Sequence, residues 1–409
     1  MLHAVKQLRD FLRPGQRIFV AGSVNEPTAL LAELAAHPLP DDLEFIQFPL
    51  GGYNQMDFTA LSSSARFTTF FMTTHLQNAD PSRLNYLPMQ MRAVFDYLCD
   101  GIDVLALQAA YDAAGTLRIG PNVDFAAAVL GCAKVVLVEV NSQFIAPPGC
   151  PALDVEKIDY VLDSARPLFE MPPPVVDETV VQIGRNVAAL IRDGDCLQTG
   201  IGGIPAAILA ALTAHNDLGI HGGLIDDGGM ALINAGNVTG RNKPIDNGRH
   251  IIGMALGSQA LIEWLAQTPT VIFKGADYTH ELSIIRQIPQ FVSINSAVEI
   301  DLYGQLNAEF ANGRQLSGTG GSVDFMRAAK ASPGGRSIIA MTATARGGSV
   351  SRIVNKVEMA TALRTDIDTV VTQFGVAQLA NLPVRARAAA LLELAAPEFR
   401  EALRAELPS

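Results

Sequence analysis

The sequence of 409 residues predicts two similar open α/β domains, each built on a mainly parallel sheet. Three observations support this fold class: an internal repeat, the alternation of short apolar strands with helices rich in alanine and leucine, and a run of prolines near the middle. Strand–helix alternation favours parallel sheets joined by right-handed crossovers. We expect one domain over residues 1–174 and a second over residues 175–409.

The repeat joins residues 13–34 to residues 192–212. Each copy has Arg-x-Gly, a short strand, a turn glycine, a proline five residues after that glycine, and a helix of Ala and Leu. The first copy has one extra residue before its turn glycine. A separation this long excludes a solenoid, whose repeats recur every ~20–50 residues. It indicates a duplicated α/β unit.

The segments between and after the copies continue the alternation. Residues 135–140 read V-V-L-V-E-V, which is typical of a strand buried on both faces of a parallel sheet. The three prolines at 172–174 predict a stiff extended linker, and we place the domain boundary there. The other elements expected are strands at 102–107, 251–254, 292–295 and 337–341, and helices at 1–13, 125–130, 259–265 and 323–330.

Composition excludes several classes of protein. Hydrophobic residues make up 49% and charged residues 17%, which permits a large core, and the net charge of -11 argues against a nucleic-acid partner. The four cysteines are widely spaced without a C-x-x-C, so we expect no metal site and no disulfide framework. We find no signal-peptide core and no apolar run of ~20 residues, so we expect a cytoplasmic protein without a membrane partner.

The first candidate binding loop joins a strand that contains Cys196 to the helix of the second repeat copy. Its glycines can take backbone conformations barred to other residues, and Pro205 suits the first turn of the helix that follows. Such a helix start presents free N–H groups to an anion or a developing oxyanion. A plain packing turn is the alternative. The residues proposed to bind are Gly200, Ile201, Gly202, Gly203 and Ile204.

A second glycine loop also opens a helix. Gly318, Gly320 and Gly321 precede Ser322, which we expect to be the N-cap residue. Its amides could hold an oxyanion. Upstream, Glu299 and a second carboxylate two residues later fall on one face of a strand, where they serve either in the site or in structural ion pairs.

Together these segments resemble the class I CoA-transferases of the acetyl-CoA hydrolase/transferase branch, which includes 4-hydroxybutyrate, butyryl and succinyl CoA-transferases. The likeness is strongest over residues 185–355. It rests on G-I-G-G-I-P at 200–205, L-G-I-H at 218–221, V-S-I-N-S-A at 292–297, and G-R-Q-L-S-G-T-G-G-S-V-D-F at 313–325.

The resemblance implies two homologous open α/β domains and a ping-pong exchange of coenzyme A between acyl groups. A glutamate attacks the acyl-CoA carbonyl to form a mixed anhydride, which CoA thiolate converts into a glutamyl-CoA thioester. The 200–204 turn would supply amides to the oxyanion. It further implies an acyl-CoA and a carboxylate as substrates, no metal, and a homodimer or larger assembly. The positions implied to contact CoA are Asn295, Gln315, Gly318, Gly320 and Gly321.

One position departs from the family pattern: its glutamate falls on Gly223, which has no side chain. Asp226 or Asp227 nearby, or Glu299 from another strand, could substitute for it, and a displaced carboxylate could activate water and favour hydrolysis. Two further alternatives are different acyl-CoA chemistry with His221 as acid or base, and binding of CoA esters without turnover. The leading interpretation is an acyl-CoA:carboxylate CoA-transferase-like enzyme acting on the thioester of a small carboxylic acid.

Overall fold

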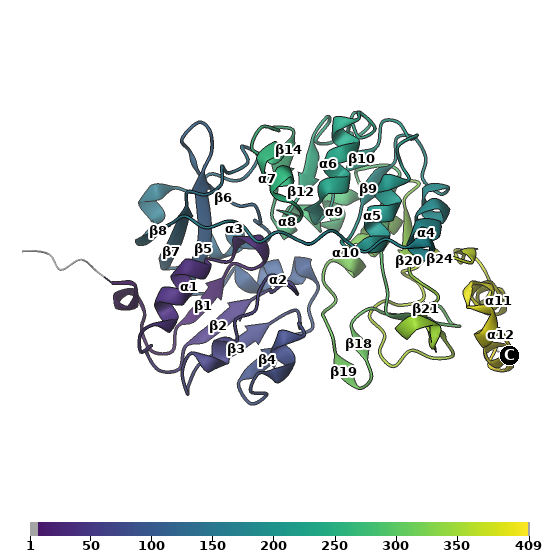
Figure 1. The fold of residues 1–409 in the computed structure, drawn as a ribbon, viewed down its shortest axis with the longest axis horizontal. Helices are drawn as coiled ribbons and strands as arrows, with labels where there is room; N and C mark the ends of the chain where they lie inside the picture. The colour runs from purple at the N-terminus through teal and green to yellow at the C-terminus, as the bar shows by residue number, and fades with distance from the viewer. Residues whose placement is uncertain (1–6, 408–409) are drawn as a thin grey trace, which may run out of the picture. The chain divides into compact units, whose positions relative to one another are not determined.

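The computed structural model describes residues 7–407 and divides the chain into two compact units. The first unit runs to Met171 and also contains Gly253–Asp277, whereas the second contains Pro172–Ile252 and the chain from Tyr278 onward. Figure 1 shows that both are α/β structures, with helices packed beside a twisted sheet in each.

The division lies near the expected boundary, but one segment differs from the expectation. Gly253–Asp277 was expected in the second domain and packs within the first unit. Backbone hydrogen bonds hold it there: Val123 N donates to Gly253 O at 2.9 Å, and Ala276 N donates to Asp124 O at 2.8 Å. The predicted second domain therefore needs correction, because these residues complete the first unit through contacts distant in the sequence.

The main sheet of the first unit has the strand order β4-β3-β2-β1-β5-β7-β8, and neighbours along this path are parallel. An additional strand, β6, pairs antiparallel with β5. The strands are β1 (Arg17–Val20), β2 (Glu44–Gln47), β3 (Arg66–Thr69), β4 (Leu84–Tyr86), β5 (Val104–Tyr111), β6 (Leu117–Ile119), β7 (Val135–Asn141) and β8 (Tyr160–Ser164).

Helices and short strands complete the first unit, and apolar side chains from β1, β2, β3 and α1 form one of its buried clusters. The helices are α1 (Thr28–Ala35), α2 (Met91–Leu98), α3 (Ala126–Leu130) and α7 (Gln259–Leu265), with 3-10 turns η1 (Leu8–Phe11), η2 (Ser23–Asn25), η3 (Phe58–Ala60), η4 (His75–Asn78) and η5 (Val155–Lys157). The short strands are β13 (Met254–Ala255) and β14 (Val271–Phe273).

The main sheet of the second unit has the order β10-β9-β15-β20-β24-β25, in which only the last pairing is antiparallel. Its strands are β9 (Cys196–Gln198), β10 (Gly219–Ile220), β15 (Phe291–Asn295), β20 (Arg336–Ala340), β24 (Thr369–Thr372) and β25 (Gly375–Gln378). Its helices are α4 (Glu178–Ala188), α5 (Gly203–Ala210), α6 (Asp227–Asn234), α9 (Leu282–Ile285), α10 (Ser322–Ala331), α11 (Val384–Leu394) and α12 (Pro397–Ala405).

The second unit also carries short strands outside this sheet, and one short helix, α8 (Ala276–Thr279), spans the division between the units. The short strands are β11 (Leu224–Ile225), β12 (His250–Ile252), β16 (Glu299–Asp301), β17 (Leu306–Asn307), β18 (Phe310–Ala311), β19 (Arg314–Gln315), β21 (Thr344–Ala345), β22 (Val350–Ser351) and β23 (Ile353–Val354), with the 3-10 turn η6 (Arg346–Gly348).

The two main sheets repeat one topology. In each, the first strand of the unit (β1 or β9) has the next strand (β2 or β10) on one side and three later parallel strands on the other. These later strands are β5, β7 and β8 in the first unit and β15, β20 and β24 in the second. The helix after the first strand, α1 or α5, also corresponds. Two homologous α/β units with mainly parallel sheets, expected from the sequence repeat, are thereby confirmed.

Most expected elements are present within a residue or two. Helix α7 has the expected bounds, whereas the expected strand over 251–254 is two short strands, β12 and β13. Of the helix expected over 1–13, the structure describes only the part from residue 7, which contains the 3-10 turn η1; residues 1–6 lie outside the described part. Between residues 7 and 407, no helix has both the length and the apolar character needed to cross a membrane.

Candidate active site

The carboxyl ends of β9 and β15 form the switch point of the second sheet, because the strand order proceeds in opposite directions from these two neighbours. Open α/β sheets bind ligands at such a point. Gln198 ends β9 and Asn295 ends β15, and Asn295 Nδ2 donates to Gln198 Oε1 at 3.1 Å. Asn295 was a sequence candidate. Gln198 was not, since a polar residue in a three-residue strand carries no signal by itself.

The first glycine loop follows β9 and opens α5. Gly202 is the N-cap residue, with φ +108°, a conformation that favours glycine. A Cβ placed on Gly200 or Gly202 would have no atom within 4 Å, so both face open space. A Cβ on Gly203 would instead lie 2.5 Å from Val175 O, so this glycine is needed for packing against the linker. Ile201 and Ile204 are partly buried in the same turn.

The second glycine loop opens α10, with one correction to the expectation. Gly321 is the N-cap residue, not Ser322, whose hydroxyl instead donates to Thr319 O at 3.0 Å. Gly320 has φ +54°, which explains a glycine at this position. Helix α10 therefore begins one residue earlier than expected. Because Gly320 and Gly321 have no Cβ, their backbone is open to a close approach.

Gln315, a predicted CoA contact, lies in β19 beside this loop. Its Nε2 donates to Glu309 Oε2 at 2.7 Å and to Ser317 O at 3.0 Å. The side chain thus bonds within its own hairpin, formed by β18 and β19. This arrangement fixes the start of the second glycine loop, and a ligand that reached the amide would have to replace or share these hydrogen bonds.

His280 lies between Gly223, which follows β10, and Gly321 of the second glycine loop. Its ring is buried, and its centroid lies 4.3 Å from that of Phe325. A Cβ on Gly223 would lie 3.4 Å from His280 Nε2 and Cε1, whereas a Cβ on Gly321 would overlap Nε2 and Cδ2. His280 Nδ1 lies 2.8 Å from Thr279 Oγ1. Nothing in the sequence around His280 indicates this position, which only the fold reveals.

Glu299, a candidate nucleophile, lies at the start of β16 and accepts two hydrogen bonds from its surroundings. Asn307 Nδ2 donates to Glu299 Oε1 at 2.9 Å, and Glu358 N donates to the same oxygen at 3.3 Å. The first of these bonds joins β16 to β17, which pair antiparallel. The carboxylate is therefore used in holding this small sheet, and its catalytic role stays a prediction.

Asp226 and Asp227, the local candidates, lie at the start of α6. Asp226 is the N-cap residue, and its Oδ1 accepts from Gly229 N at 2.9 Å. Burial raises the pKa of Asp226, and the neighbouring Asp227 carboxylate raises it further. Asp227 lies in the first turn, where the helix dipole favours a negative charge. Both positions have a structural explanation, so neither is singled out as a nucleophile.

His221, the other candidate acid or base, is fully buried directly after β10. Burial lowers its pKa to about 3, and the positive charge of Lys243 lowers it further. The imidazole is therefore neutral at neutral pH. Its ring centroid lies 6.3 Å from that of Phe291, within the core of the unit. This environment favours a structural role for the residue.

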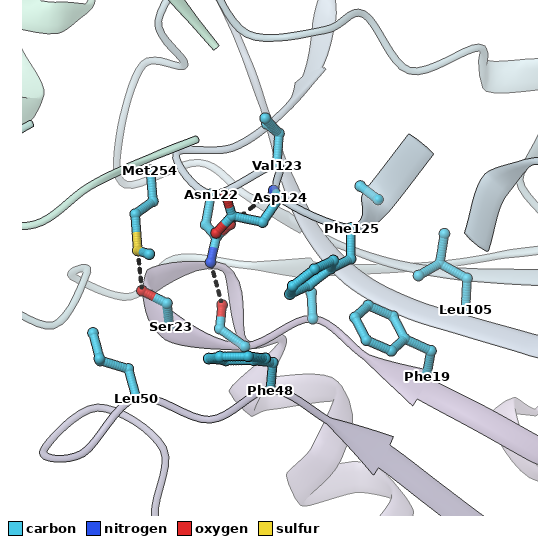
Figure 2. A pocket seen from close by; sticks show the side chains of 13 residues that line it. Phe19, Ser23, Phe48, Leu50, Leu105, Asn122, Val123, Asp124, Phe125 and Met254 are labelled. Carbon is cyan, nitrogen blue, oxygen red and sulfur yellow. Dashed lines mark hydrogen bonds between the residues drawn. The ribbon is translucent and has the colours of Figure 1, made fainter. Parts of the chain in front are cut away.

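The first unit has a cavity at the carboxyl ends of β1 and β2, shown in Figure 2. Its volume is about 40 Å³, and aromatic rings form much of its wall. Dashed lines in the figure mark hydrogen bonds that tie its polar rim, including Asn122 Nδ2 to Gly22 O at 3.3 Å. The lining side chains labelled there are Phe19, Ser23, Phe48, Leu50, Leu105, Asn122, Val123, Asp124, Phe125 and Met254.

Asp124 is the titratable group of this cavity. It is buried, and its Oδ1 has no hydrogen-bond partner within the described part of the chain. Burial raises the pKa of Asp124 to about 8, so the carboxyl group is mostly protonated at neutral pH. A protonated carboxyl in apolar surroundings can donate a hydrogen bond to a carbonyl oxygen. Sequence reasoning did not find this residue, since its burial depends on Gly253–Asp277.

The described residues, 7–407, contain no cluster of three or more His, Cys, Asp and Glu side chains arranged to hold a metal ion. Of the cysteines, Cys196 is buried in β9, as its place in a predicted strand indicated. The second unit brings together open amides in the first glycine loop, an amide pair at the switch point and a buried imidazole. This arrangement suits the stabilisation of a negative charge that develops on a carbonyl oxygen.

Comparison with known proteins places this arrangement in a family. The model of the acetyl-CoA hydrolase/transferase C-terminal domain matches residues 257–407. The 4-hydroxybutyrate coenzyme A transferase of Clostridium kluyveri is 34% identical over 398 residues, covering 95% of this chain and 92% of that protein. An acetyl-CoA hydrolase of Candida albicans is 28% identical over 220 residues, covering 51% of this chain and 39% of that protein.

Solved structures agree. RipA from Yersinia pestis superposes with a TM-score of 0.89 at 30% identity, covering 97% of this chain and 94% of that one. The 4-hydroxybutyrate CoA-transferase from Porphyromonas gingivalis gives a TM-score of 0.81 at 30% identity, with the same coverage. The chain therefore belongs to the CoA-transferase family of the acetyl-CoA hydrolase/transferase type.

Proposed function

We propose that this protein is an acyl-CoA:carboxylate CoA-transferase-like enzyme that acts on the CoA thioester of a small carboxylic acid. The proposal is supported above all by the glycine loop after β9, where Gly200 and Gly202 face open space at the start of α5. Amides fixed at a helix N-terminus stabilise a carbonyl oxygen as it gains negative charge. The thioester carbonyl would lie against this loop, at the switch point marked by Gln198 and Asn295.

Coenzyme A would be held by the polar and glycine positions around the same end of the sheet. Its pantetheine arm, which carries the acyl group, would run between the two glycine loops, where a ligand can approach the backbone without hindrance from Cβ atoms. Relatives named as CoA-transferases and acetyl-CoA hydrolases support the cofactor. The residues proposed to contact it are Asn295, Gln315, Gly318, Gly320 and Gly321. The absence of a metal, a cytoplasmic location and assembly as a homodimer or larger belong to the same proposal.

Hydrolysis of the thioester is the second candidate function, and Gly223 is the observation that favours it. A mixed anhydride needs a carboxylate beside the thioester, and glycine at 223 supplies none. Asp226 caps α6 and Glu299 bonds to its own small sheet, so neither is free to move without cost. With no protein carboxylate to accept the acyl group, water can attack the carbonyl directly and release free CoA.

The test is to incubate the purified chain with a panel of short acyl-CoAs, with and without acetate. Thiol appearance is followed with a chromogenic disulfide, and CoA esters are separated by chromatography. Exchange of the acyl group without net thiol supports the transferase, and thiol release that does not need acetate supports the hydrolase. Tight binding by calorimetry without either reaction would overturn both and leave a protein that binds CoA esters.

A further inference from the structure

His280 occupies the space next to the position where the family resemblance implies a glutamate. Its Nε2 lies close to the Cβ positions of both glycines: at Gly223 it is as near as Cε1, and at Gly321 it is the nearest ring atom. The nitrogen therefore lies between Gly223, in the loop after β10, and the second glycine loop. A side chain at 321 would collide with the ring, so a glycine there is a condition for this placement.

The space beside Gly223 accepts an atom in contact with Nε2. A Cβ there would lie 3.4 Å from Nε2 and Cε1, and the next nearest atom outside the adjoining residues, Phe325 Cε2, is 3.9 Å away. A water oxygen is no larger than the methyl group that fits here. A shift of a few tenths of an ångström would bring it within the ~2.6–3.2 Å from Nε2 that proton transfer needs.

The contact with Thr279 is compatible with the tautomer that such a role requires. His280 Nδ1 lies 2.8 Å from Thr279 Oγ1, and when Nδ1–H donates to this hydroxyl, the lone pair resides on Nε2. Burial lowers the pKa of His280 to about 3, so the ring stays neutral at all pH values above that range. Its basicity is then comparable to that of a carboxylate, the group it would replace.

We propose that His280 is the general base of a thioester hydrolysis at this site, in place of the glutamate nucleophile. This inference rests on the proposed thioester site and favours hydrolysis, the second candidate function, over transfer. The water oxygen bonds to the carbonyl carbon while its proton passes to Nε2. The C–S bond then breaks, the proton passes from Nε2 to the leaving thiolate, and the products are a carboxylic acid and CoA. No other reactant is needed.

The competing explanation is that the His280 ring only fills the space that a glutamate side chain at position 223 would occupy. His280→Gln separates the two, since it keeps a polar side chain but removes the base. A positioned general base contributes about 10²–10⁴-fold to a rate. We expect His280→Gln to lower kcat for thiol release from acetyl-CoA at least ~100-fold. Its Kd for acetonyl-CoA, a ketone analogue that water cannot cleave, should stay within about threefold, a change of under ~1 kcal/mol.

Gly223→Ala provides a second test that does not depend on the histidine variant folding. Its methyl group would fit at 3.4 Å from Nε2 and would fill the space proposed for water. We expect native stability, unchanged binding of acetonyl-CoA and loss of most thiol release. If His280→Gln unfolds, this variant decides alone.

Three results would overturn the role of His280. They are thiol release by His280→Gln within threefold of the native rate, retention of activity by Gly223→Ala, and exchange with acetate but no hydrolysis by the native protein. The last would leave the proposed transferase standing. Failure of the native protein to bind acetonyl-CoA at all would instead refute the proposed thioester site, so the two failures are distinguishable.

Discussion

Replacing Gly321 by alanine should destabilise the protein, whereas the same change at Gly223 should leave its stability nearly unchanged, although both glycines border the same ring. A Cβ at 321 would overlap His280 Nε2 and Cδ2 and lie 3.2 Å from Phe325 Cε2. The imidazole cannot yield easily, because it is buried and packed on Phe325 with a centroid separation of 4.3 Å. At 223, the same methyl group meets ordinary van der Waals distances.

The magnitude follows from two effects at Gly321. Overpacking a core by one methyl group costs about 1–3 kcal/mol. Alanine is also a poor N-cap residue, which adds roughly 0.5–1 kcal/mol. We therefore expect Gly321→Ala to lower the free energy of unfolding by about 1.5–4 kcal/mol, and Gly223→Ala to change it by less than ~0.5 kcal/mol.

Urea denaturation of both variants and the native chain, followed by circular dichroism, measures these differences. For a unit of this size, the larger loss corresponds to a fall in Tm on the order of 5–15 °C. Equal stability of Gly321→Ala and the native protein would refute the placement of His280 between the two glycines. So would a Gly223→Ala variant as unstable as Gly321→Ala.

Three further outcomes are expected. Burial lowers the pKa of His221 and of His280 to about 3, so their contribution to stability is complete above pH 6.5 and is lost as pH falls. Between pH 7 and 5, the free energy of unfolding of His280→Gln should therefore fall by ~2 kcal/mol less than that of the native chain. Equal losses in urea titrations would contradict this. Asp226→Ala should cost about 1 kcal/mol as a lost cap while kcat is kept; a collapse of kcat would make Asp226 catalytic. Gly202→Ala, at φ +108°, should lower the free energy of unfolding by ~1–2 kcal/mol and kcat at least tenfold. The control Gly236→Ala, at φ +81°, should lose the same stability and keep its kcat. Equal kcat in both variants would contradict a catalytic role of the first glycine loop.

The sequence predicted the parts of the fold that depend on local pattern. The repeat, the helix α7 and the strand β7 follow from periodicity and from apolar runs, which act within a few residues. The glycine loops were also found, since glycine and proline restrict or free the backbone locally. The N-cap of α10 was misplaced by one residue because Gly321 and Ser322 are both acceptable caps.

The parts that escaped prediction depend on contacts between distant residues. His280 meets Gly223 and Gly321 only after β10, α8 and α10 have assembled, and no spacing in the sequence records this. Gly253–Asp277 returns to the first unit through backbone hydrogen bonds to residues distant in the sequence, and these leave no trace in the composition. The burial that protonates Asp124 arises from that same return. In each case the chemistry of the residue is set by its surroundings more than by its neighbours in the chain.

The most direct test of the central claim is a crystal structure of the protein with acetonyl-CoA bound. The glycine loop at the start of α5 should hold the ketone oxygen at about 2.7–3.1 Å from a backbone amide of residues 200–204, with the carbonyl carbon facing His280 Nε2. An analogue bound elsewhere, with both glycine loops untouched, would contradict the account.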